Sequence, residues 1–132
     1  MEDWIETAIS DWKLSDTKLN PGTSLAEIVN TEKLLGFNFP EDFKQLYLKV
    51  NGFVDWDWQQ HMFSLWPLNR IVEEYTKSDN NFVGFCDFLI NSHSIGFKKD
   101  LKGIFKNYDA DSICESFAEA IVMINNSSDL IY

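Results

Sequence analysis

Histidine and cysteine are scarce in this sequence, which has two of each among 132 residues. Neither His61 nor His93 has a cysteine, an aspartate or the other histidine at the spacing of a metal site. Cys86 and Cys114 form no Cys-x-x-Cys pair, and the six glycines form no phosphate-binding loop. The sequence therefore predicts no catalytic residues, no metal site and no cofactor.

A thiol nucleophile and a calcium site are two further possibilities, and the neighbouring residues argue against both. Cys86 lies in a phenylalanine-rich run, where burial raises the pKa of a thiol and makes it a poor nucleophile. Asp109 and Asp111 have the spacing that starts a calcium loop. The glycine and glutamate that such a loop requires are replaced by Cys114 and Ala120, so we reject a calcium site.

Basic residues and long apolar runs are also limited. The 11 Lys and Arg face 21 Asp and Glu, which gives a net charge of −10. This charge repels nucleic acid and anionic membranes and favours association with a basic protein, although solubility alone would also explain it. The lysines cluster only at Lys98, Lys99, Lys102 and Lys106, which we interpret as a solvated hairpin.

No apolar run approaches the roughly 20 residues of a membrane span. The start of the sequence, Met1-Glu2-Asp3-Trp4, is acidic where a secretory signal is basic. We therefore expect a cytoplasmic protein whose cysteines stay reduced and pack inside the fold.

Aromatic residues, by contrast, are abundant: 11 Phe, 5 Trp and 4 Tyr, within a hydrophobic fraction of 45%. This content excludes a disordered acidic tail and supplies a core for one domain over residues 1–132.

The first half of the chain has the apolar spacing of three helices. The first is expected over Glu2–Lys13, and residues 14–23 are expected to form a loop. A capping-box pattern at Ser24–Glu27 opens the second helix, which Gly36 ends. Its expected apolar face is Leu25, Ile28 and Val29, with Leu35 as a further candidate. Pro40 suits the first turn of the third helix, with Phe43, Leu46, Tyr47 and Val50 inward and Asn51-Gly52 at its end.

The second half indicates short strands and two helices. Residues 54–58 alternate as in a strand, and a returning strand is expected over 61–66. A short helix is expected over 69–77, with Ile71, Val72 and Tyr75 inward. The apolar run 82–90 suits a central strand, and 95–97 and 103–105 suit two more. A capping box at Ser116 opens the last helix, with Ser112 as an alternative start; its inward residues are Phe117, Ala120, Ile121 and Ile124.

This order of elements predicts an α+β domain with N-terminal helices, an antiparallel-rich central sheet and a closing C-terminal helix. Residues 34–47, LLGFNFPEDFKQLY, then lead into Asn51-Gly52. This leucine-glycine pair, proline, acidic-aromatic helix start and closing Asn-Gly resemble the signature of the SUKH superfamily. Residues 65–71, 88–97 and 116–120 resemble its later strands and closing helix. The resemblance covers residues 24–132, and residues 1–23 form a variable N-terminal helix and loop.

The resemblance implies an α+β fold without catalytic residues and a role in immunity, in which the protein binds and blocks a toxin domain, often a nuclease. Some members resemble regulatory scaffolds instead, so a regulatory module with a non-toxin partner is the alternative. An enzyme with an unrecognised site is a third, less favoured possibility, and a homodimer stays possible.

The resemblance does not imply particular partner-binding residues, so residue type is the remaining guide to a binding surface. Tryptophans flanked by acids are typical of interface anchors. Trp56 and Trp58 alternate with Asp55 and Asp57, and the tryptophans could instead be core. An acidic face, formed by the two aspartates with Glu73 and Glu74, would then remain as a dock for a basic toxin.

Overall fold

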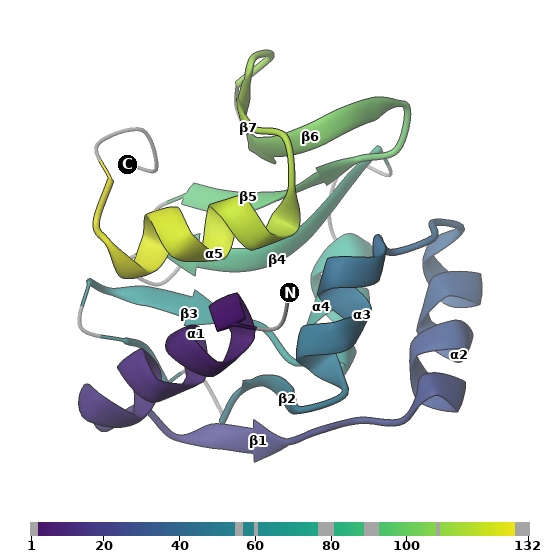
Figure 1. Ribbon diagram of the computed structural model, residues 1–132. Coiled ribbons are helices and arrows are strands. Elements are labelled where there is room, and N and C mark those ends of the chain that lie inside the picture. The colour runs from purple at the N-terminus through teal and green to yellow at the C-terminus, as the bar shows by residue number, and fades with distance from the viewer. Residues whose placement is uncertain are drawn as a thin grey trace.

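Five helices and two antiparallel sheets make up the described part of the chain (Figure 1). The structure is a computed structural model that describes residues 3–54, 57–59, 61–76, 81–88, 93–107 and 109–128. The predicted α+β domain with N-terminal helices, an antiparallel sheet and a closing helix is confirmed. No helix in the described residues is long and apolar enough to cross a membrane.

Helix α1 (Asp3–Leu14) packs against the closing helix α5 (Phe117–Asn125), so the first and last elements lie side by side. The apolar spacing of α1 faces the core, because Ile5, Ala8 and Trp12 are buried and Trp4 and Ile9 are half-buried. The Trp12 indole N–H donates to Asn125 Oδ1 at 2.8 Å and ties the two helices together. In α5 the capping box at Ser116 and all the predicted inward residues are confirmed.

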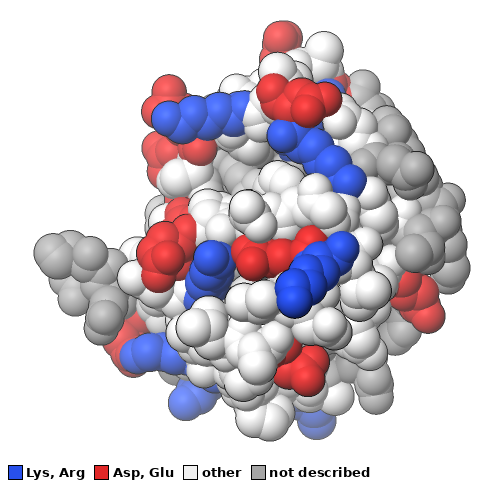
Figure 2. All heavy atoms as spheres, turned by 90° about the vertical axis from the view of Figure 1, so that its right-hand side faces the viewer, with Lys and Arg blue, Asp and Glu red and all other residues white. Residues whose placement is uncertain are grey.

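Helix α2 (Leu25–Leu35) begins and ends where the sequence predicts, but its apolar face differs. The Glu27 N–H donates to the Ser24 hydroxyl, and Gly36 ends the helix with φ of 66°. Leu25 and Val29 were expected to be buried, yet they are 57% and 40% exposed. The reason is that α2 packs along α4 (Leu68–Thr76) on the outside of the molecule, so it buries a narrow stripe: Ile28, Thr31, Glu32 and Leu35. The side of the molecule that carries α2 faces the viewer in Figure 2.

Helix α3 (Glu41–Tyr47) begins after Pro40 and is shorter than predicted. Asn51-Gly52 does not end it but lies in strand β2 (Val50–Phe53), which pairs with β1 (Leu19–Pro21) in the segment predicted to be a loop. Gly52 has φ of 69°, and a Cβ there would lie 2.4 Å from the Pro67 nitrogen. The glycine is therefore required by a close backbone approach and not by a helix end.

The larger sheet has the order β3-β4-β5-β6-β7, antiparallel throughout: Phe63–Leu65, Phe82–Phe88, His93–Lys98, Leu101–Lys106 and Ser112–Cys114. The strands predicted around residues 61–66, 82–90, 95–97 and 103–105 are confirmed where described; residues 89 and 90 lie outside the described part. β7 was missed. The alternative helix start at Ser112 is wrong, because Ser112 pairs with Phe105 in the sheet.

Two helix and strand predictions near the candidate site have different outcomes. The helix predicted over 69–77 is α4; Ile71 is buried, and Val72 and Tyr75 are half-buried. The strand predicted over 54–58 is wrong at Asp57 and Trp58, which belong to no strand. The neighbouring residues 55 and 56 lie outside the described part.

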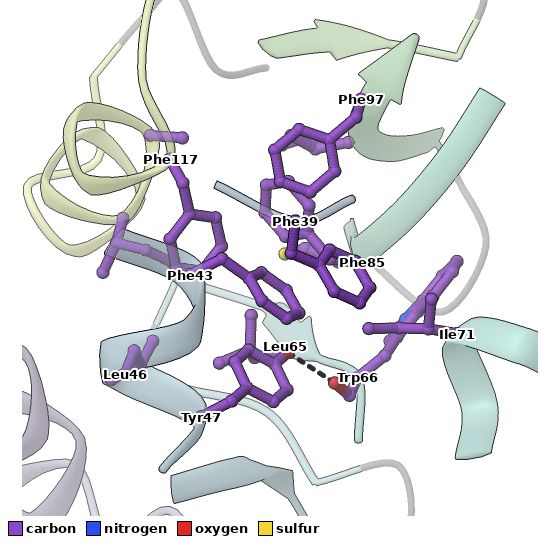
Figure 3. Packing of buried hydrophobic residues seen from close by; sticks show 14 of the residues in the cluster. Phe39, Phe43, Leu46, Tyr47, Leu65, Trp66, Ile71, Phe85, Phe97 and Phe117 are labelled. Atoms are coloured by element: carbon purple, nitrogen blue, oxygen red, sulfur yellow. Dashed lines mark hydrogen bonds between the residues drawn. The ribbon is translucent and has the colours of Figure 1, made fainter. Parts of the chain in front are cut away.

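An aromatic stack joins the helices to the sheet (Figure 3). Phe43 of α3 stacks on Phe39 and Tyr47 with centroid distances of 4.0 and 4.1 Å. The Phe117 ring of α5 meets Phe43 edge-on at 5.0 Å and Phe85 of β4 at 4.9 Å. Burial raises the pKa of Tyr47, so its hydroxyl stays protonated and donates to the Trp66 carbonyl at 2.6 Å. Edge-to-face and offset pairs of this kind add stability beyond the area they bury.

We expect Gly52→Ala to destabilise the fold more than Gly36→Ala, its matched control with the same left-handed backbone. Any L-residue in this conformation costs roughly 1–2 kcal/mol. A Cβ at Gly36 would meet Lys99 Nζ at 3.6 Å, whereas a Cβ at Gly52 would collide with the backbone of Trp66 and Pro67. The forced shift adds about 1–3 kcal/mol at Gly52. Urea unfolding measures both losses, and equal losses would contradict the close approach.

Candidate functional site

The predicted binding segment follows β2, and only its second half is described, because Asp55 and Trp56 lie outside the described residues. Asp57 is half-buried and serves the fold. Its carboxylate accepts a hydrogen bond from the Lys18 backbone N–H at 2.6 Å, and its carbonyl accepts one from the Ser64 hydroxyl at 2.6 Å. Its charge is therefore held at the junction of two chain segments.

Trp58 is 38% exposed, so it is not the core residue that one reading of the sequence allowed. Residues 58 and 59 are hydrogen-bonded to other parts of the fold. The Trp58 carbonyl accepts from the Thr17 hydroxyl at 3.1 Å. The next residue, Gln59, is buried and accepts the N–H groups of His61 and Phe63 at 2.6 and 3.2 Å. Trp58 thus presents an aromatic surface on a loop that is held in place.

The two remaining predicted residues lie on a different element, helix α4. Glu73 is exposed, and Glu74 is half-buried with its carboxylate 3.8 Å from Arg70 Nε. The structure therefore places the described acids on two separate elements: Asp57 lies on the β2–β3 connection, and Glu73 and Glu74 lie on α4.

A buried ionic group that sequence reasoning missed lies behind α4. Asp87 accepts hydrogen bonds from the Trp66 indole at 2.8 Å and from Arg70 Nη2 at 3.3 Å. The Arg70 guanidinium also lies 4.7 Å from the centre of the Trp66 ring. A buried charge is tolerated only when it is paired and hydrogen-bonded, as here. The signal in the sequence was a single acid within the apolar run 82–90, together with the chain's one arginine.

Two acids that flank the leucine-glycine-to-proline segment are also structural. Glu32 is buried; its Oε2 accepts the Phe39 N–H at 2.8 Å and lies 3.6 Å from Lys44 Nζ. Asp42 accepts the N–H of Ala118 at 2.9 Å and so caps the start of α5 from a distant part of the chain. These carboxylates have backbone partners and are not arranged as an acid–base pair.

The described cysteines and histidines do not form a reactive group. Burial, helped by the Asp87 charge, raises the pKa of the Cys86 thiol well above its usual range. Burial and Glu119 raise the pKa of Cys114 to about 11. His93 is buried with its ring 6.4 Å from Phe63. Within the described residues, no three His, Cys, Asp or Glu side chains gather as a metal site.

Comparison with known protein families shows which family the chain matches. The sequence model of the SMI1 / KNR4 family (SUKH-1) matches residues 22–130, which is more than four fifths of the chain. The match confirms the resemblance seen in the Leu-Gly, Pro and Asn-Gly pattern. A search of curated proteins finds no match.

We expect both thiols to react slowly with a thiol-labelling reagent at pH 8 in the folded protein and rapidly in urea. Only the thiolate attacks, and the raised pKa values keep the folded thiols protonated at this pH. Raising the pH from 8 to 10 should speed the labelling of Cys114, because the thiolate fraction rises about tenfold per pH unit below the pKa. Fast native labelling at pH 8 would contradict this account.

Proposed function

The chain belongs to the SMI1 / KNR4 family (SUKH-1), and from this membership we propose that it is an immunity protein. It would neutralise a cognate toxin by stoichiometric binding, without chemistry of its own. The observation that carries the proposal is the family match over residues 22–130, because the family has protein-binding roles and is generally non-catalytic. The matched range, residues 22–130, nearly coincides with the core domain that we propose over residues 24–132.

The charge of the chain supports a basic toxin, such as a nuclease, as the partner. A nuclease needs a basic surface to hold a phosphate backbone. A protein of net charge −10 is attracted to such a surface over several ångströms and competes with nucleic acid for it. We therefore propose a protein partner in the cytoplasm and neither nucleic acid nor a membrane.

The buried polar side chains have partners inside the fold, which supports a non-catalytic role. In the described residues the buried acids Glu32 and Asp87 each have hydrogen-bond partners within the fold. The buried thiol of Cys86 has a raised pKa, which keeps it protonated. An active site would instead need such groups to converge on a cleft.

A regulatory or scaffolding module that binds a non-toxin protein is the alternative, because the same fold and charge would serve it. Gene neighbourhood separates the two functions: an adjacent toxin gene favours immunity, and an isolated gene favours regulation.

Co-expression with the product of the adjacent toxin gene tests the proposal. We expect the chain to restore growth to cells that produce the toxin and to co-purify with it in a fixed ratio. Growth that is not restored, together with no complex, would exclude immunity. A toxin from an unrelated system is the control and should not be neutralised.

We expect Trp58→Ala to weaken toxin binding, because an exposed tryptophan on a fixed loop is the typical anchor of an interface. The expected loss is about 2 kcal/mol, or about 30-fold in Kd, without loss of stability. Val122→Ala is the matched control, since Val122 is 43% exposed on α5. Titration calorimetry measures both. Equal affinities for Trp58→Ala and wild type would remove Trp58 from the proposed surface, which also includes Asp55, Trp56, Asp57, Glu73 and Glu74.

A further inference from the structure

A continuous groove crosses the side of the molecule formed by α2, the loop after it and β6. Two hollows lie along α2, and Val29 and Lys33 line both of them. The hollow nearer the end of α2 is also lined by Phe37 and Asn38, which line a third hollow as well. The third hollow has a volume of about 360 Å³ and reaches β6. We call this surface the α2–β6 groove and define it by six residues: Leu25, Val29, Lys33, Phe37, Leu101 and Lys102.

The groove exposes apolar side chains. Leu25, Val29 and Leu101 are 57%, 40% and 54% exposed. Phe37 is half-buried, and its ring lies 5.2 Å from that of Phe97 in the floor of the third hollow. Exposed apolar residues that adjoin one another and surround a hollow mark a binding surface, whereas single ones do not.

Two of the three exposed charged residues that line the groove are lysines. Lys33 and Lys102 are exposed at its margin. Of the lining acids, Glu32 is held by the Phe39 N–H and Lys44, and Asp42 is held by the Ala118 N–H. Glu115 is the exposed lining acid that remains.

Lys99 also lies near the groove, because a Cβ at Gly36 would lie 3.6 Å from Lys99 Nζ, but its ammonium donates to the Tyr75 hydroxyl and is not among the exposed charges of the groove. Figure 2 shows this side, with basic side chains above and below a band of uncharged atoms and acidic ones among them.

We infer that the α2–β6 groove receives an amphipathic segment of the partner that carries both acidic and apolar side chains. Carboxylates of that segment pair with Lys33 and Lys102, and an apolar side chain enters the hollow over Phe37. The inference rests on the proposed function, since the partner is the toxin.

The groove is a second contact, away from Trp58. The β2–β3 connection that carries Trp58 enters β3 at the left of Figure 1, and α2 stands at the right. The net charge of the chain attracts the basic body of the toxin over distance, and the groove fixes which acidic segment fits.

Charge reversal on two sides of the molecule separates local pairing from net charge. The double variant Lys33→Glu/Lys102→Glu and its control, Lys13→Glu/Lys49→Glu, both replace exposed lysines and both change the net charge from −10 to −14. If net charge alone governed binding to a basic toxin, both variants would bind more tightly. We expect the groove variant to bind at least 10-fold more weakly and the control to bind as tightly as wild type or more so.

The measurement is titration calorimetry of each purified variant against the toxin recovered from the co-expressed complex, with thermal unfolding to confirm the fold. Equal changes in Kd for the two double variants would contradict a role of the groove in binding. No complex with the wild-type protein would overturn the proposed function and the groove together. If the wild-type protein forms the complex and the groove variants have the wild-type Kd, the inference about the groove is wrong and the proposed function stands.

An uncharged pair keeps the inference testable if charge reversal disturbs α2. Val29→Ser/Leu101→Ser leaves the net charge at −10, and Leu14→Ser/Val122→Ser is the control on other exposed apolar residues. We expect a Kd at least 5-fold higher for the groove pair only, mainly through faster dissociation. Binding of a 20-nucleotide single-stranded DNA by the wild-type protein, lost in the groove variants, would instead assign the lysines to nucleic acid and overturn the inference.

Discussion

The backbone of Gly52 touches the backbone of Trp66 and Pro67, and the arrangement of helices and sheet depends on this contact. The neighbouring Asn51 side chain accepts the Leu68 N–H at 3.0 Å and so starts α4. The Trp66 carbonyl accepts from Tyr47 of α3, and its indole donates to Asp87 of β4. Two dipeptides in contact, Asn51-Gly52 and Trp66-Pro67, thus join the small sheet, two helices and the large sheet. Their contact leaves no room for a side chain at position 52.

This interior has a direct bearing on function. Its polar groups satisfy one another: Asp87 binds Trp66 and Arg70, and Glu32 and Asp42 hold backbone N–H groups. Such partners hold these side chains in place within the fold. The outer surfaces, by contrast, expose Trp58 on a fixed loop and an apolar, lysine-edged groove along α2. A rigid frame with varied outer surfaces suits a protein that binds a partner, because little order is lost on association.

The sequence predicted the features that depend on local signals and missed those set by distant contacts. The capping box at Ser116 and the stop at Gly36 are local, and both are correct. Leu25 is exposed because of the side on which α2 packs against the molecule. The apolar periodicity of α2 alone does not reveal that side. The strands β1 and β7 have three residues each, too few for a period-two pattern, and exist through pairing with β2 and β6. At the candidate site, residue type alone suggested Trp58, and the structure shows that its side chain is exposed. The lysine-edged groove could not be seen in the sequence, because it joins α2 to β6.

The central claim is that the chain blocks its partner by occupying it and not by altering it. Titrating a fixed concentration of the active toxin with the chain, well above Kd, tests this claim most directly. The account predicts that residual toxin activity falls linearly and reaches its floor at a fixed stoichiometric ratio, and that intact toxin is recovered when the complex is denatured. Full inactivation by a small fraction of an equivalent, or toxin recovered with an altered mass, would contradict it.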